Sequence, residues 1–233
     1  MKRIVPLFLA VLLTTLGATA SHHLINVGDF TTLMVIDNLN VVYTCNADSA
    51  GMAVVDCDDA IAQMLIFRND KGRLKVQISS DAIGLRDLPT IYLYSADLNE
   101  CENAGDSALR IMSVPEHEKF TARLSDNGKV FVNNVKASEL TLAIITGRGR
   151  IFASGECEKI NLKLVGSGEI QADDVKAGEA KCTLTGTGRI GCYVDGGELY
   201  VKGAGTGKVY YRGTPSNIKM RKLGPIKAIP MTE

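Results

Sequence analysis

The sequence contains no tryptophan, and aromatic side chains make up only 6% of its 233 residues. Surfaces that stack on sugars or nucleobases need such side chains, so this composition disfavours both kinds of surface. Net charge is lacking too, because 26 Lys and Arg residues balance 26 Asp and Glu residues. A chain without net charge has no global attraction for polyanions, so we expect no nucleic-acid partner.

A hydrophobic run long enough to span a bilayer is also missing. The apolar run over residues 5–16 is too short for a transmembrane helix. It follows the basic pair Lys2 and Arg3 and precedes the small-x-small triplet Ala18-Thr19-Ala20, which is the pattern of a secretory signal peptide. We predict cleavage after Ala20 and an exported protein in the periplasm, on the outer surface or outside the cell.

Motifs of catalysis and metal binding are absent as well. No serine or cysteine lies in a nucleophile elbow, and the cysteine spacings match no zinc pattern. Acidic clusters of the kind used by polysaccharide-degrading enzymes do occur, but acidic residues in turns are usually solvated turn formers. A pair of histidines near the predicted mature N-terminus is a candidate metal pair on a frayed end. We predict no catalytic, cofactor-binding or metal residues. The residues weighed are Asp56, Asp58, Asp59, Asp173, Asp174, His22 and His23.

What the sequence does contain is a repeat built on a Gly-x-Gly-x-Ile/Val phrase. Aligned on the second glycine, the copies lie 21, 19, 20 and 19 residues apart, at Gly128, Gly149, Gly168, Gly188 and Gly207. A weaker copy covers residues 104–109. Between the phrases, apolar residues alternate with polar ones, which is a strand signal. Equivalent apolar positions are Leu142, Leu162, Cys182 and Val201.

A period near 20 residues matches one coil of a small parallel β-helix. At roughly 3.3 Å per strand residue, each repeat supplies about 60 Å of contour, and coils stack at about 4.8 Å. We therefore predict an all-β fold, a parallel, right-handed β-helix-like solenoid. A meander of antiparallel hairpins is the alternative. The paired glycines then serve as corners that tolerate positive φ. A phosphate loop would instead require a helix after the glycines, and no helical pattern follows them.

The chain is predicted to hold one domain after the signal peptide of residues 1–20. Residues 21–114 are an irregular strand-rich part, residues 115–213 carry the repeats, and residues 214–233, interrupted by three prolines, are expected to cap the solenoid. A single domain is favoured because no Pro-, Gly- or Ser-rich linker separates the first two parts.

Six cysteines remain after the predicted cleavage. Cys45 and Cys57 flank a turn-rich stretch, so a disulfide across a hairpin is plausible there. Cys157, Cys182 and Cys192 fall on the inward phase of the repeat. For the last two, buried thiols are favoured over a bridge across the interior.

One outward position stands out along the repeat, between the second glycine and the following Ile or Val. It is occupied by Lys129, Arg150, Glu169, Arg189 and Lys208. In a β-helix these side chains line up along one edge. The four basic residues are our candidate ligand-facing residues, with a solvated edge that only prevents aggregation as the alternative.

These features resemble the putative auto-transporter adhesin, head-GIN domain family of bacterial envelope proteins. The resemblance rests on the strands over 30–43, 74–78 and 93–101 and on the serial glycine phrases up to Tyr210. It implies an exported β-helix-like protein, and it offers no catalytic residues to carry over.

We therefore predict a non-enzymatic, exported adhesin-like or structural binding module of the cell envelope, without cofactors. Its expected partners are an envelope glycan, a lipid headgroup or a surface protein. Two alternatives stay open: a polysaccharide-active enzyme on the same scaffold, and a scaffold that self-associates end to end.

Overall fold

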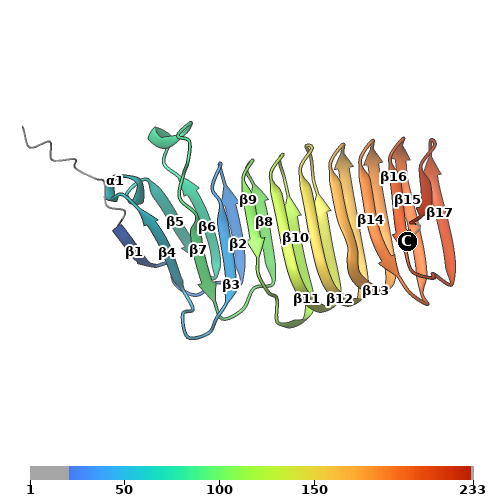
Figure 1. The fold of residues 1–233 in the computed structure, drawn as a ribbon, viewed down its shortest axis with the longest axis horizontal. Coiled ribbons are helices and arrows are strands. Elements are labelled where there is room, and N and C mark those ends of the chain that lie inside the picture. The colour runs from blue at the N-terminus through green and yellow to red at the C-terminus, as the bar shows by residue number, and fades with distance from the viewer. Residues whose placement is uncertain (1–20, 232–233) are drawn as a thin grey trace, which may run out of the picture.

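The computed structural model describes residues 21–231, and the predicted signal peptide lies outside the described residues. The chain forms an elongated β-solenoid of about seven turns, with 65% strand and 3% helix (Figure 1). Coils lie about 20 residues apart. The predicted all-β solenoid is confirmed. The antiparallel meander is wrong for the repeats, because their strands pair in parallel.

The repeat region stacks its coils in the order of the sequence. The three longest strands each run along one face of the solenoid, bend at a register shift and continue along the opposite face. The strands are β10 (Glu116–Leu124), β11 (Lys129–Ile144), β12 (Arg150–Gly166), β13 (Glu169–Gly186), β14 (Arg189–Val194), β15 (Glu198–Gly205) and β16 (Lys208–Arg212).

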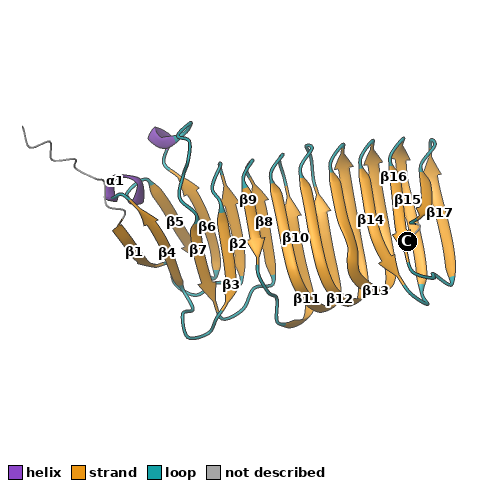
Figure 2. Cartoon of the chain, in the orientation of Figure 1, coloured by secondary structure: helices purple, strands orange, loops and turns teal. Residues whose placement is uncertain are grey.

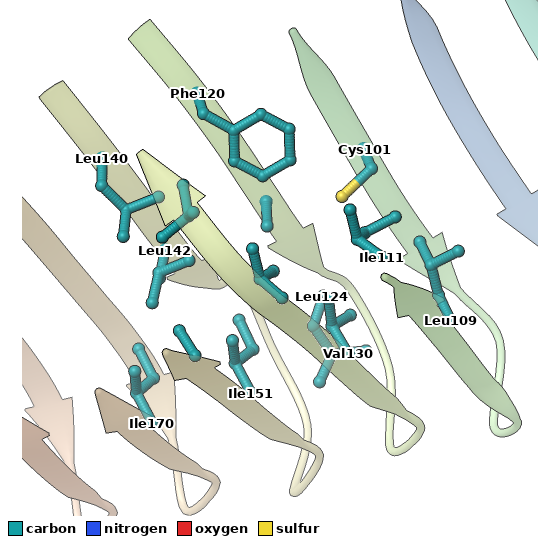
Figure 3. Close-up of a cluster of buried hydrophobic side chains, with 14 of the residues drawn as sticks. Cys101, Leu109, Ile111, Phe120, Leu124, Val130, Leu140, Leu142, Ile151 and Ile170 are labelled. Carbon is teal, nitrogen blue, oxygen red and sulfur yellow. The ribbon is translucent and has the colours of Figure 1, made fainter. Parts of the chain in front are cut away.

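Stacked aliphatic columns form the core between the two faces of the coiled sheet. Ile151, Ile170 and Ile190 occupy one inward column and are fully buried, as the alternation predicts. Cys182 takes its place in another column between Leu162 and Val201. Figure 3 shows how residues from successive coils, such as Leu124, Val130 and Leu142, point into a shared interior. Each coil therefore buries its apolar face against its neighbours.

The paired glycines form the corners on one side of the solenoid. Gly166, Gly186 and Gly205 each have φ near +120°, which glycine adopts without steric cost. A Cβ on Gly186 would lie 2.2 Å from the backbone oxygen of Gly166 in the coil before it. Close stacking of coils thus requires glycine here, and this explains the repeated phrase.

The N-terminal coils follow a different order in space than in sequence. β2 (Thr32–Ile36) lies between β6 (Arg73–Ile78) and β8 (Glu100–Ala104), all in parallel. β3 (Val41–Cys45) lies likewise between β7 (Ile91–Ser95) and β9 (Ala108–Ile111). The coil formed by β2 and β3 is therefore inserted between two coils that come later in the chain.

Antiparallel strands cover the outer side of the first coil. β1 (Ser21–Asn26) pairs with β4 (Met52–Cys57), which pairs with β7, and β5 (Leu65–Asp70) pairs with β6. The helix α1 (Asp59–Ala62) lies between β4 and β5, and the 3-10 turn Ser80–Ala82 lies between β6 and β7. His22 and His23 belong to β1, so the expectation of a frayed terminus there is wrong.

The C-terminal segment forms the last coil of the solenoid. β17 (Asn217–Leu223) pairs in parallel with β15, and β18 (Lys227–Pro230) pairs in parallel with β16. The coils therefore continue past residue 213, where the repeats were expected to end, and residues 217–230 form one further coil at the C-terminal end. Gly224 provides its corner with φ of 95°, stacked on Gly205.

Candidate functional site

The outward side chains of the predicted basic residues line up as a ladder. Lys129 pairs with Arg150, Arg150 with Glu169, Glu169 with Arg189 and Arg189 with Lys208 in the strand register. Since each pair lies on neighbouring coils, the rungs are about 4.8 Å apart. The structure thus brings all four predicted residues together.

The ladder has a sixth member that the sequence did not reveal. Lys227 on β18 pairs with Lys208, so the column continues onto the last coil. We call the set Lys129, Arg150, Glu169, Arg189, Lys208 and Lys227 the basic ladder. The repeat signal was hidden there because Ile226 replaces the second glycine of the phrase and Ala228 replaces its Ile or Val, although the 19-residue interval from Gly205 to Gly224 was available as a clue.

The basic ladder is exposed and carries an excess of positive charge. Its five basic residues are all exposed, whereas the side chain of Glu169 is only 22% exposed. Arg150 Nε lies 3.7 Å from Glu169 Oε2. One acidic group therefore offsets one of five positive charges, and the remaining basic side chains face solvent.

An aromatic column runs beside the basic ladder on the same outward face, two residues further along each strand. The rings of Phe131 and Phe152 stack with centroids 4.9 Å apart and an interplanar angle of 8°. The guanidinium of Arg110 lies 4.4 Å from the Phe131 centroid, a cation–π contact. Tyr210 joins the same column on β16. The low aromatic content of the chain gave no sign that three of its rings share one outward column.

A shallow hollow opens in this column at Gly191. It has a volume of about 640 Å³ and is bordered by Phe152, Arg189, Tyr210 and Asp173. A Cβ at Gly191 would lie 3.0 Å from Asp173 Oδ1 and 3.5 Å from Met231 Cε. Because glycine has no side chain, this space at the bottom of the hollow stays open. Aromatic, basic and acidic groups thus converge on a space able to admit a small polar group.

The acidic clusters are engaged by neighbouring side chains. Arg212 lies 3.9 Å from Asp173 and 3.4 Å from Asp174. Asp56 contacts His22 Nδ1 at 2.7 Å. His23 Nε2 lies 3.0 Å from the carbonyl oxygen of Cys57. Within residues 21–231, no three His, Cys, Asp or Glu side chains form a group suited to a metal ion.

The structure does not bring Cys45 and Cys57 together. Cys45 pairs with Ser95 at one end of β7, while Cys57 lies two residues beyond the Val55–Ile91 pair at the other end. This separation of six strand residues is roughly 20 Å, whereas a disulfide needs Cα atoms within about 7 Å. β3 and β4 do not form the expected hairpin, because β7 lies between them.

Cys182 and Cys192 meet in the interior as thiols. Their sulfur atoms are 4.0 Å apart, twice the length of a disulfide bond. The hydrogen bond to Cys192 and burial raise the pKa of the Cys182 thiol well above its usual value. Burial also raises the pKa of Cys157 to about 12. Both groups are therefore protonated at neutral pH and behave as small apolar residues.

In residues 21–231, no helix is long and apolar enough to cross a membrane. Stacked parallel coils that present repeated surface columns place the chain among β-solenoid proteins. The chain belongs to the family described as "Putative auto-transporter adhesin, head GIN domain", which matches residues 29–215. The resemblance inferred from the glycine phrases is thereby confirmed.

Three solved structures share this fold at low sequence identity. A "putative adhesin" from Bacteroides fragilis superposes with a TM-score of 0.83 at 19% identity, covering 92% of this chain and 98% of the other. A "putative lipid binding protein" from Parabacteroides distasonis gives 0.72 at 20% identity, covering 92% and 97%. A "putative adhesin" from Parabacteroides merdae gives 0.71 at 18%, covering 92% and 97%. No relative was found among the curated proteins.

Proposed function

We propose that this chain is an exported, non-enzymatic binding module that recognises anionic components of the cell envelope through the basic ladder. The ligand groups are carboxylates or phosphates, carried by an acidic glycan or by lipid headgroups. Export is supported by the signal-peptide pattern of residues 1–20, and the adhesin-like role by the family to which the chain belongs.

The observation that carries the proposal is the alignment of five exposed basic side chains in one column over six successive coils, interrupted only by Glu169. Over Lys129 to Lys208 the column runs through four coil steps, or roughly 19 Å. Charges held in a line by a rigid scaffold match a linear polyanion or a charged surface better than a compact ligand. Contacts of this type weaken as salt increases, because exposed charges are screened.

The enzymatic alternative has less support. Asp173 and Asp174 border the hollow at Gly191, but both carboxylates form ion pairs with Arg212. Ion pairing accounts for their placement without a reaction. The adhesin description of the family also favours binding over catalysis.

End-to-end self-association also has less support. The last coil carries Lys219, Arg221 and Pro230 on its edge strands. Lysine, arginine and proline are the residue types by which natural edge strands avoid pairing with other chains. These residues favour an end that does not stack.

The description of one structural neighbour as a "putative lipid binding protein" agrees with a headgroup as the ligand. Since its identity to this chain is 20%, it supports the shared fold, and the ligand remains our proposal.

The test replaces Arg150, Arg189 and Lys208 together by serine. Binding is measured to polygalacturonate and to phosphatidylglycerol vesicles, at low and at moderate salt. The matched control replaces Lys136, Lys159 and Lys176 by serine. These substitutions remove the same amount of charge, but from the far side of the coils.

We expect the parent protein to bind at least one of these ligands at low salt, and the ladder variant to lose binding by about tenfold or more. The control should bind as the parent does. Equal loss in both variants would indicate a general charge effect, and unchanged binding of the ladder variant would leave only a role in solubility.

A further inference from the structure

The paired-glycine turns lie together along one edge of the solenoid. They join the strands on one face of the solenoid to those on the opposite face, and Figure 2 shows them as narrow teal loops along the upper edge. The loop of residues 79–90, between β6 and β7, rises from the same edge, since it joins the corresponding strands of the first coil. We call this the turn edge.

An exposed apolar column follows the turn edge on the side opposite the basic ladder. Val165, Thr185, Ala204 and Leu223 pair in succession, and Ile145 precedes them one coil earlier. The exposed fraction is 48% for Ile145, 48% for Val165 and 76% for Leu223. The side chains of this column point away from the core, because they occupy the outward positions of their strands.

Large exposed apolar side chains concentrate at this edge. Ten such residues occur among residues 21–231, and five of them lie on the turn edge. The other five are distributed over the remaining surface. Those on the turn edge are Ile83 and Leu85 in the loop of residues 79–90, together with Ile145, Val165 and Leu223.

Basic residues flank the apolar column on both sides. Lys163, Lys202 and Arg221 lie two residues before it, and the basic ladder lies just beyond the glycine turn. The five turn segments 143–150, 163–170, 183–190, 202–209 and 221–227 contain nine Lys and Arg residues and one acidic residue, Glu169. Aliphatic groups are thus set between two rows of positive charge.

The opposite side of these coils has the opposite charge. We call it the bulged edge, because the strands bend there at register shifts. Its five segments 134–138, 154–158, 173–178, 193–197 and 212–216 contain five Asp and Glu residues and three basic residues, Lys136, Lys176 and Arg212. The coils therefore carry positive charge on the turn edge and negative charge on the bulged edge, which would orient the protein in front of an anionic surface.

We infer that the turn edge docks on an anionic lipid membrane, which deepens the proposed function by naming the source of the phosphate groups. A soluble glycan would use the charges but has no need of the aliphatic column. A membrane interface uses both, because apolar groups enter the headgroup boundary while basic groups contact anionic lipids. The lysine and arginine stems can lie along the apolar groups and keep their charges at the headgroups.

The crest of the turn edge suits a flat surface. Between the two rows, Arg148 occupies the middle of the first paired-glycine turn and adds a further positive charge, whereas the next three turns consist of glycine with Ser167, Thr187 and Thr206. These residues are short, so the longer aliphatic and basic side chains on either side reach the surface first. The loop with Ile83 and Leu85 provides a second apolar contact at the far end of the same edge (Figure 1).

The test removes the apolar column and keeps every charge. The variant replaces Ile145, Val165 and Leu223 by serine. The matched control replaces Leu24, Ile66 and Met112, three exposed apolar residues elsewhere on the surface. The purified protein is sedimented with vesicles of phosphatidylcholine containing phosphatidylglycerol and with vesicles of phosphatidylcholine alone, and polygalacturonate binding is measured in parallel. Thermal unfolding of each variant verifies that it is folded.

We expect the parent protein and the control to bind the anionic vesicles, and the column variant to lose that binding by about tenfold. Binding to polygalacturonate, if present in the parent, should be the same in the column variant. A column variant that sediments with anionic vesicles as the parent does would overturn membrane docking. So would equal loss in the control.

The outcomes separate this inference from the proposed function. A parent protein that binds polygalacturonate but not vesicles contradicts membrane docking and leaves the basic ladder as a glycan site. A parent protein that binds neither ligand at low salt contradicts both.

Discussion

Ile190 and Arg189 are adjacent in sequence but point to opposite sides of the coil wall, which makes them a sharp test of the stacked arrangement. Ile190 is fully buried and lies between Ile170 and Val209 in the inward column. Arg189 is exposed in the basic ladder. Substitutions at the two positions should therefore differ strongly in their effect on the free energy of unfolding.

The magnitude follows from what each substitution removes. Ile190→Val loses one methylene and should cost about 0.5–1.5 kcal/mol, and Ile190→Ala about 2–5 kcal/mol, since rigid neighbouring coils leave a cavity. Ile190→Asp adds the cost of burying a polar group without a partner and should cost several kcal/mol more. Because domains are stable by about 5–15 kcal/mol, this last variant should be largely unfolded. Arg189→Ser should change stability by no more than about 0.5 kcal/mol.

Urea unfolding followed by circular dichroism measures the series. The graded Val and Ala substitutions keep the test informative even if the Asp variant does not fold. If Arg189→Ser lowered the unfolding midpoint as much as Ile190→Ala, the assignment of inward and outward columns would be refuted.

Three further predictions concern the corners, the thiols and export. Gly188→Ala should cost about 1–3 kcal/mol, because its Cβ would lie 2.4 Å from a backbone oxygen of the preceding coil; Thr187→Ala beside it should cost no more than about 0.5 kcal/mol, and equal urea midpoints would contradict the stacked corner. The pKa of Cys157 is raised to about 12 by burial in the folded protein, whereas a thiol in the unfolded chain titrates at about 8.5. The contribution of the protonated Cys157 thiol to the free energy of unfolding is therefore fully present below about pH 8.5 and is lost as pH rises toward 12. Cys157→Ala, with alanine as its register neighbour on both sides, should flatten the fall in thermal stability between pH 7 and pH 10.5, whereas an unchanged fall would contradict this. The intact mass of the exported protein should equal that of a chain beginning at Ser21. A mass that includes residues 1–20 would exclude cleavage after Ala20.

The coil architecture of the repeats could be predicted from sequence because local spacing determines it. Paired glycines at intervals of 19–21 residues mark corners, and period-two alternation assigns side chains inward or outward. Together these two signals were sufficient to place Arg150 beside Lys129 and Arg189 beside Lys208. Stacking of successive coils requires no further information, since neighbours in sequence are neighbours in space.

The N-terminal topology could not be predicted in this way. Alternation identifies β2, β3, β6 and β7 as strands, but it does not say which strands pair. The insertion of the β2–β3 coil between later coils depends on contacts between residues distant in sequence, such as Leu33 with Leu74. For the same reason Cys45 and Cys57, which are close in sequence, were wrongly expected to be close in space.

The candidate site was predicted in part. The order of the basic ladder follows from the repeat, whereas its continuation to Lys227 was obscured because Ile226 replaces the second glycine of the phrase. The aromatic column also follows from the repeat, because Phe131, Phe152 and Tyr210 each lie two residues after a ladder position. The contact of Arg110 with Phe131 could not be predicted in this way, because it depends on the register of β9 with β11. The apolar column was missed since Ile145, Val165 and Leu223 occupy positions that hold threonine and alanine in the coils between.

Hydrogen–deuterium exchange of the protein with and without an anionic ligand tests the central claim most directly, because it locates the contact. With saturating phosphatidylglycerol vesicles or polygalacturonate, we predict slower exchange in the turn segments 145–150, 165–170, 185–190 and 204–209. Segments 134–138, 154–158 and 173–178 on the bulged edge should exchange as in the free protein. Protection confined to the bulged edge, in a protein shown to be bound, would contradict binding through the turn edge and its basic ladder.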